Sequence, residues 1–399
     1  MLRLRRLLAI LLVVFVRFVF YAGADSFTHN ITGQVLHGYR TGQREDGLTV
    51  VHTVQQGLTK LDMNEWTVSL NHLGRKHRVV VIGFDGPLKL QVVSEALHRA
   101  ISEVSESGPV LIMLEMDSSG GKTEYIERLC DLIVRIDYCP IFAFVRGGEY
   151  GGALSGASAV ALACDEIYMA PNTTIGAASL VTSQSMISSD ELSVAWQQYL
   201  ASLAQRRNRP GLLARAMVDK DISVIEVIRD GERLFIDPAE REPNDVFVAR
   251  WSESGSLLTL TAVEAVQCGI SRSVVAGRSE LLQKIGAASA EIVVSSDAVE
   301  AERTFRKAKL KFARLRRSLD ANIKRLELTE NIPQAIALLR EVREQYKSLL
   351  LLARRYQDLY LDTELIEQQL NKAEDYYEKA KQRQRMLDAN EVKDSRPVQ

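Results

Sequence analysis

The chain has few of the residues that mark metal, redox or nucleic-acid-binding proteins. Only four cysteines occur in 399 residues, and none stands in a paired CxxC spacing, so neither a zinc nor a dithiol motif is present. Acidic and basic residues nearly balance at a net charge of −1, which gives no electrostatic reason to expect a nucleic-acid partner. We therefore expect no metal and no cofactor. Cys130 and Cys139 could pair in an oxidising compartment.

Long apolar runs are also lacking, except near the start of the chain. Arg3, Arg5 and Arg6 precede the apolar residues 7–16, and small residues follow at 22–24, a pattern typical of a signal peptide. Residues 1–24 are therefore expected to be a signal peptide or an N-terminal membrane anchor. Arg17 favours cleavage, because a charge at the centre of a span costs roughly 2.5–3.5 kcal/mol. Either alternative places the body outside the cytoplasm, periplasmic or membrane-anchored.

What remains has the composition of a globular protein, with 46% hydrophobic and 25% charged residues. We expect an N-terminal extension at 25–77, an α/β domain at 78–295, a helical hairpin or bundle at 296–388 and a disordered tail at 389–399. The extension shows only short strand-like pieces, at 48–54 and 66–70.

The α/β domain alternates apolar runs with stretches of helical spacing. Strands are predicted at 79–84, 110–116, 140–145 and 167–170, and helices at 88–104, 123–136 and 157–163. Repeated βα units imply a mainly parallel sheet covered by helices. Sites in such folds gather at the carboxyl ends of the strands, where residues 117–121 and Ser155 are expected.

Ser155 is the most informative residue of the chain. It follows an apolar strand and a glycine-rich turn, and it precedes a run of small residues that predicts a tightly packed helix. Main-chain N–H groups at a helix start are unpaired and can hold a negative charge. A serine nucleophile that forms a tetrahedral oxyanion needs this placement.

Residues 296–388 are rich in charge, with apolar positions at intervals of three and four. Pro333 should begin a new helix, so two or three antiparallel helices are expected, packed on themselves or on a neighbouring subunit. The early part of this region is basic. It is either a solvated face or a surface that touches anionic lipid.

Several motifs of the α/β domain occur in the order of a known family. Residues 78–286 resemble the ClpP-class serine proteases, most closely the membrane-associated NfeD group and its relative signal peptide peptidase A. The resembling segments are Asp-Ser-Ser-Gly-Gly at 117–121, Ala-Leu-Ser-Gly at 153–156, and the segments at 169–177, 202–208 and 258–270. The resemblance as a whole covers about half of the chain and does not include the extension or the helical region.

The resemblance implies a ClpP/crotonase-like spiral of βα units and a serine endopeptidase chemistry. Ser155 would be the nucleophile, and the N–H groups of Gly121 and Gly156 would form the oxyanion hole. Glycine at 121 is expected because backbone must approach a substrate carbonyl there. The family also implies a homo-oligomer that acts on membrane or envelope proteins.

The general base is missing from its usual places. All six histidines precede Ser155, and the related soluble proteases would have theirs near Ala177 or Ala178. The NfeD group's lysine position holds Glu191 here, and no lysine occurs between Lys122 and Lys220. Lys122 is the tentative base and Lys220 a second candidate, since burial can lower the pKa of a lysine. Glu191 would be a poor substitute near neutral pH.

Three hypotheses follow. The first is an exported or membrane-associated serine protease that uses Ser155. The second is a catalytically inactive relative that serves as an oligomeric scaffold or binding module. The third, a crotonase-type acyl-CoA enzyme, is disfavoured by the export segment and the serine turn.

Overall fold

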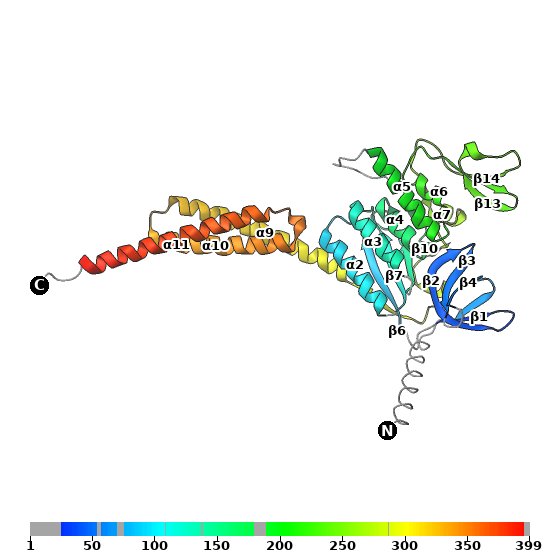
Figure 1. The fold of residues 1–399 in the computed structure, drawn as a ribbon, viewed down its shortest axis with the longest axis horizontal. Coiled ribbons are helices and arrows are strands. Elements are labelled where there is room, and N and C mark those ends of the chain that lie inside the picture. Colours follow the sequence, from blue (N-terminus) through cyan, green and yellow to red (C-terminus); the bar gives the residue numbers. More distant parts are fainter. Residues whose placement is uncertain are drawn as a thin grey trace, which may run out of the picture. The chain divides into compact units, whose positions relative to one another are not determined.

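The computed structural model describes residues 25–53, 57–69, 76–107, 109–136, 139–178, 189–285 and 287–394. Two compact units make up the chain (Figure 1). The first consists of Met1–Lys89 with Ser94–Ala298, and the second of Leu90–Val93 with Val299–Gln399. The N-terminal segment 1–24, for which we expect a signal peptide or anchor, lies outside the described residues. No helix in the described ranges is both long and apolar enough to cross a bilayer.

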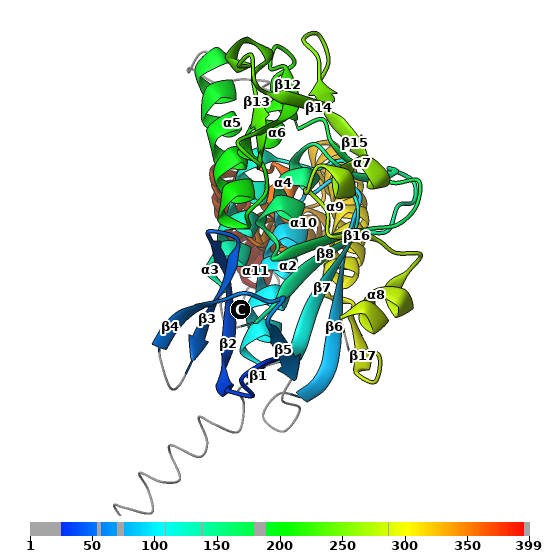
Figure 2. The same ribbon diagram turned by 90° about the vertical axis from the view of Figure 1, so that its right-hand side faces the viewer.

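A six-stranded parallel sheet forms the centre of the first unit, in the order β16-β10-β8-β7-β6-β17 (Figure 2). Its strands are β6 (Lys76–Asp85), β7 (Pro109–Asp117), β8 (Ile141–Val145), β10 (Glu166–Met169), β16 (Ser273–Val274) and β17 (Glu291–Ser295). Three helices connect the early strands: α2 (Gln91–Glu106), α3 (Thr123–Arg135) and α4 (Gly156–Ala163). The predicted mixed α/β architecture with a parallel sheet is confirmed.

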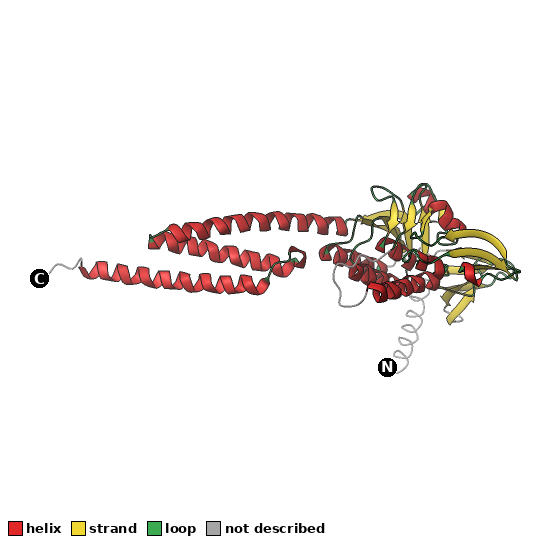
Figure 3. Cartoon of the chain, turned by 90° about the horizontal axis from the view of Figure 1, so that it is seen from above, coloured by secondary structure: helices red, strands yellow, loops and turns green. Residues whose placement is uncertain are grey.

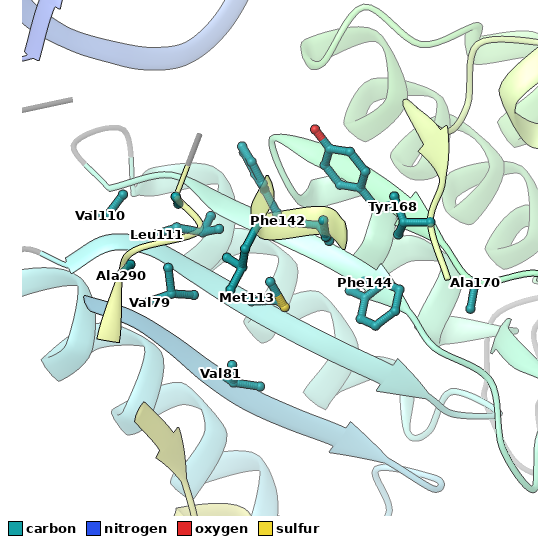
Figure 4. Close-up of a cluster of buried hydrophobic side chains, with 14 residues drawn as sticks. Val79, Val81, Val110, Leu111, Met113, Phe142, Phe144, Tyr168, Ala170 and Ala290 are labelled. Atoms are coloured by element: carbon teal, nitrogen blue, oxygen red, sulfur yellow. The ribbon is translucent and has the colours of Figure 1, made fainter. Parts of the chain in front are cut away.

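The sheet is covered on both faces, as its sequence requires. Every residue of β7 and of β8 is buried, which explains why both strands are continuous apolar runs. On one face, side chains such as Val81, Met113 and Phe144 pack into a single cluster (Figure 4). This rigid centre fixes the loops that leave the carboxyl ends of β6, β7 and β8.

A small second sheet, β15-β11-β9, lies next to these loops in the chain. It contains β9 (Gly152–Leu154), β11 (Thr174–Gly176) and β15 (Thr259–Thr261). β9 and β11 pair in parallel, and β15 joins β11 antiparallel. The remaining helices of the unit are α5 (Ser189–Arg206), α6 (Gly211–Ala216), α7 (Ala262–Gln267) and α8 (Arg278–Lys284).

The structure contains two antiparallel sheets that the sequence patterns do not predict. Residues 25–69 form a five-stranded sheet in the order β4-β3-β2-β1-β5, not two isolated pieces. Its strands are β1 (Asp25–His29), β2 (Val35–Glu45), β3 (Leu48–Thr53), β4 (Gly57–Leu61) and β5 (Trp66–Ser69). A further sheet, β13-β12-β14, contains β12 (Val224–Arg229), β13 (Glu232–Ile236) and β14 (Val246–Ser252).

The second unit is built on three helices, α9 (Asp297–Leu328), α10 (Ile332–Arg355) and α11 (Thr363–Asp394) (Figure 3). Leu319, Val342, Leu349 and Ala373 join all three in one core. Asn331 caps α10 by accepting from the Gln334 N–H at 3.0 Å, and Pro333 stands in the first turn. α11 continues to Asp394, beyond residue 388 where we expected a disordered tail, because residues 389–394 contain neither glycine nor proline.

Candidate functional site

Ser155 stands between β9 and α4, as predicted. It is the N-cap residue of α4, with φ 54° and ψ −132°. A positive φ is unfavourable for a residue with a Cβ, by about 1–3 kcal/mol. The Ser155 N–H donates to the carbonyl of Gly176 at 2.9 Å, which fixes the turn on β11. The strained main chain therefore places Ser155 at the start of α4. The Ser155 side chain is half-buried.

The loop after β7 meets this turn at Gly120. Gly120 has φ +90°, and a Cβ there would lie 2.5 Å from the Gly156 nitrogen and 3.1 Å from the Ser155 Cβ. The structure gives a further reason for glycine at position 121, which the sequence did not indicate. A Cβ on Gly121 would lie 2.3 Å from the Leu88 carbonyl oxygen, so its close neighbour is the protein's own backbone. Gly120 is the residue that the sequence reasoning missed.

Two main-chain N–H groups are left over at this junction. Leu88 and Gly121 form a parallel bridge. Its two hydrogen bonds involve the neighbours of Gly121: the Leu88 N–H donates to the Gly120 carbonyl at 2.7 Å, and the Lys122 N–H donates to the Leu88 carbonyl at 3.0 Å. In a parallel bridge of this kind, the N–H of the middle residue points to the other side. The Gly156 N–H belongs to the first turn of α4 and has no helical acceptor. Among the described residues, neither N–H takes part in a hydrogen bond.

Asp117 and Ser118 tie the two loops together. The buried Asp117 carboxylate accepts from the N–H groups of Tyr150 and Gly152, each at 3.1 Å. Ser118 exchanges main-chain bonds with both sides of Ala153, at 2.8 and 2.9 Å, and its hydroxyl donates to the Gly86 carbonyl at 2.6 Å. These contacts give the Asp-Ser-Ser-Gly-Gly motif its structural role.

The candidate base, Lys122, is the N-cap residue of α3. Its amine lies 3.4 Å from the Tyr125 hydroxyl and 5.0 Å from the centre of that ring. In the described part of the chain, no side chain makes a hydrogen bond to the Ser155 hydroxyl. This holds for Lys220, the second candidate base, as well. The Glu191 side chain and residues 179–188 lie outside the described residues.

Ala177 and Ala178 stand where the family resemblance led us to expect a histidine. Ala177 follows Gly176, the acceptor of the Ser155 N–H, and donates to the Leu258 carbonyl at 2.9 Å. Ala178 donates to Met217 at 2.6 Å and accepts from the Trp196 indole at 2.8 Å. Both are held by the backbone, and neither has a group that could take a proton.

Charged groups lie on the elements that carry the site. Asp85 and Arg146, at the ends of β6 and β8, form an ion pair of 2.7 Å. Burial raises the pKa of Asp85, and Arg146 opposes this effect. At the far end of α4, the buried Arg209 donates to the carbonyls of Leu162 and Cys164, and burial lowers its pKa to about 10. Its cation satisfies orphan carbonyls at the C-terminal end of the helix.

Other candidate sites in the described residues do not include Ser155. No group of three His, Cys, Asp or Glu side chains there could hold a metal ion. A groove of about 620 Å³ is lined by Asn208, Arg209, Arg233, Phe235 and Gly269, among others, and contains none of the predicted site residues. Cys130 and Cys139 are buried, and no disulfide joins them.

Comparison with known proteins confirms the resemblance to the NfeD group. Residues 87–244 match the family of the NfeD1b N-terminal domain. The membrane protein NfeD1b of Bacillus subtilis (strain 168) is 28% identical over 239 residues, which are 60% of this chain and 48% of that protein. The chain therefore spans about half the length of this curated relative. The matched residues include Gly121, Lys122 and Ser155.

Solved structures give weaker similarity. The 1510-N membrane protease specific for a stomatin homolog from Pyrococcus horikoshii is 20% identical, with a TM-score of 0.38, and the match covers 57% of this chain and 99% of that one. A mutant of the 1510-N membrane-bound stomatin-specific protease in complex with a substrate peptide is also 20% identical, with a TM-score of 0.41 and coverage of 57% and 97%.

Proposed function

From the match to the NfeD1b N-terminal domain, we propose that residues 78–295 form a ClpP-like serine-peptidase domain, a spiral of βα units, that binds a peptide carbonyl beside Ser155. The observation that carries the proposal is the contact of Gly120 with Gly156 and Ser155. In the proposal, the N–H groups of Gly121 and Gly156 meet the serine hydroxyl at this junction. That junction provides a nucleophile and two donors for an oxyanion.

The proposed reaction is acyl transfer to Ser155. The serine oxygen bonds to the peptide carbonyl carbon, its proton passes to a base, and the carbonyl oxygen becomes an oxyanion. The C–N bond then breaks, the amine leaves with a proton, and water hydrolyses the ester. Each N–H donor is worth about 3 kcal/mol of barrier. Lys122 is the proposed base, and its amine must leave Tyr125 and be neutral to act.

We further propose association with a membrane and an envelope or membrane protein as the substrate. The arginines and the apolar run of residues 1–24 favour export or anchoring. The curated relative is itself named a membrane protein, which agrees with this location. Self-association belongs to the same proposal, and light scattering on the purified chain tests it.

The second candidate function is a binding module that does not hydrolyse peptides. Two observations favour it: the Lys122 amine lies on Tyr125, and Ala177 and Ala178 replace the expected histidine. In this case, the site would hold a peptide carbonyl without reaction, and residues 296–388 would provide an oligomeric scaffold. Deletion of residues 298–399 would then break the oligomer, while Ser155→Ala would leave it intact.

A fluorophosphonate probe tests the first function on the full chain. The probe reacts only with an activated serine, so we expect labelling of the wild type and none in Ser155→Ala. The neighbouring Ser119→Ala is the matched control and should label as the wild type does. Lys122→Met should reduce the rate of labelling by roughly 10²–10⁴-fold, the usual contribution of a general base.

The outcomes separate the two candidates. Labelling that is lost in Ser155→Ala alone supports the peptidase. A folded protein that does not react, but that binds extended peptides, supports the binding module. Absence of both reaction and peptide binding would remove both functions from this site.

A further inference from the structure

The first half of α9 carries an unusually one-sided distribution of charge. Eight cations occur within residues 303–317, and no acidic residue lies among them. All eight are solvent-exposed. They are Arg303, Arg306, Lys307, Lys309, Lys311, Arg314, Arg316 and Arg317.

The orientation of this half of the helix is fixed by its opposite side. Phe305 and Ala308 are buried in a core with Leu352 and Tyr356 of the same unit, and Phe312 and Leu315 pack against it. The eight cations stand at the other positions of the helical wheel. They therefore form a continuous basic surface, which we call the α9 basic face.

Acidic partners are almost absent from this face. Of the eight cations, only Arg306 forms an ion pair with a described residue, at 2.9 Å with Glu302. On the other two helices, ion pairs are more frequent. Several of their cations pair with carboxylates, as in Arg343–Glu374, Lys379–Asp375 and Lys381–Glu378. Neighbouring cations lie within a Debye length of about 10 Å and repel one another, so the face favours an external anionic surface.

Two exposed apolar side chains share the stripe of the basic face, Leu310 within it and Val299 one turn before it. Val299 is 65% exposed and Leu310 is 58% exposed. Positions 299, 303, 306, 310, 314 and 317 follow one another at intervals of three and four, so the apolar and basic residues share one stripe. Nucleic-acid phosphates offer no partner for aliphatic groups. The boundary between headgroups and acyl chains takes both kinds of side chain.

We propose that the α9 basic face binds the surface of a membrane rich in anionic phospholipid. The phosphate groups neutralise the cations, and Val299 and Leu310 enter the headgroup region. This inference does not depend on the chemistry of Ser155, because every residue of the face lies outside the matched segment 87–244.

Vesicle co-sedimentation of the full chain tests the proposal. One set of vesicles is pure phosphatidylcholine, and the other also contains phosphatidylglycerol. The apolar run of residues 7–16 can bind both kinds, so the measured quantity is the increase in affinity that phosphatidylglycerol produces. We expect this increase in the wild type, and we expect added salt to reduce it.

A triple variant, Lys307→Gln, Arg314→Gln and Arg317→Gln, removes three cations from the face. Each neutralised cation should weaken the phosphatidylglycerol-dependent binding roughly fivefold, so the triple variant should lose roughly a hundredfold. The matched control, Arg354→Gln, Lys379→Gln and Lys381→Gln, changes the net charge equally but removes cations that already have carboxylate partners. It should bind nearly as the wild type does.

Other arms distinguish the sources of phosphate. Leu310→Ser should weaken vesicle binding without a change of charge, and inorganic phosphate should not displace the protein. Equal binding to both vesicle types, an equal loss in the control variant, or displacement by inorganic phosphate would overturn the proposal. Tighter binding to duplex DNA than to vesicles, lost in the triple variant, would overturn it in favour of a nucleic acid. If the triple variant melts early, the pair Lys307→Gln and Arg314→Gln should still lose roughly twentyfold.

Discussion

Ser155 and Gly120 depend on each other at the centre of the site. The serine has a positive φ, which persists only where the surroundings hold it, and Gly120 supplies one of these contacts by approaching without a side chain. Any Cβ at position 120 would overlap the Gly156 nitrogen. The geometry of the nucleophile therefore depends on a residue outside the turn that carries it.

Gly120→Ala tests this dependence. We expect the free energy of unfolding to fall by more than the roughly 1–2 kcal/mol that a left-handed conformation alone costs an alanine. Reaction or binding at Ser155 should be lost. Gly231→Ala is the control, since Gly231 has a similar φ of +84° but open space around its Cα. Urea unfolding measures both, and equal losses in the two variants would contradict the packing argument.

The sequence predicts part of this site and not the rest. A strand, a glycine-rich turn and a run of small residues place Ser155 at a helix start, because these patterns are local. The contacts of Gly120 with Ser155 and of Gly121 with Leu88 join residues more than thirty positions apart. No local pattern distinguishes the two glycines, so neither the contact of Gly121 with Leu88 nor the packing of Gly120 can be predicted from the sequence.

At the scale of elements, the sheet β13-β12-β14 is held by ion pairs as well as by a small core. Arg229 donates two bonds of 2.7 Å to Asp245, which precedes β14, and the Glu242 N–H donates a third at 2.8 Å. The hydrogen bonds from Arg229 lower the pKa of the Asp245 carboxyl to about 2. Ile225, Val227 and Ile236 form the apolar part of this sheet.

This carboxylate should make stability depend on pH in a defined window. The pKa is lower in the folded than in the unfolded protein, where it is about 3.9, so the contribution is present above about pH 4 and is lost as pH falls toward 2. Asp245→Asn should flatten the fall in unfolding free energy between pH 5 and pH 2. Glu232→Gln, an exposed change on β13, should keep the wild-type slope. Parallel slopes for wild type and Asp245→Asn would contradict the assignment.

The elements differ in how well the sequence predicts them. β7 and β8 are predicted because burial on both faces requires a continuous apolar run. β14 carries exposed Val246, Phe247 and Val248 and has no clear alternation. In the N-terminal sheet, the core consists of Phe27, Leu36, Val51 and Leu61, one from each of the strands β1 to β4. Such cores form only after the strands pair, so local patterns understate them.

At the scale of the molecule, the two units have separate cores. Leu349 is 5% exposed within the core that joins α9, α10 and α11, and no residue of the central parallel sheet belongs to that cluster. Leu349→Ala should cost about 2–5 kcal/mol in the helical unit. Hydrogen exchange should show faster opening of α9, α10 and α11, with protection of β7 unchanged. Equal loss of protection in β7 would show that the units unfold together.

All four thiols belong to the first unit, and each is at most 2% exposed. Burial raises the pKa of Cys164 and of Cys268 to about 12, so these sulfurs are both shielded and protonated at neutral pH. The folded chain should therefore not react with maleimide until that unit opens. The rate of alkylation then measures how often the first unit opens. Residues 299–399 contain no cysteine. A single cysteine introduced into α9 would therefore react selectively with a dye, while the four native cysteines stay unlabelled.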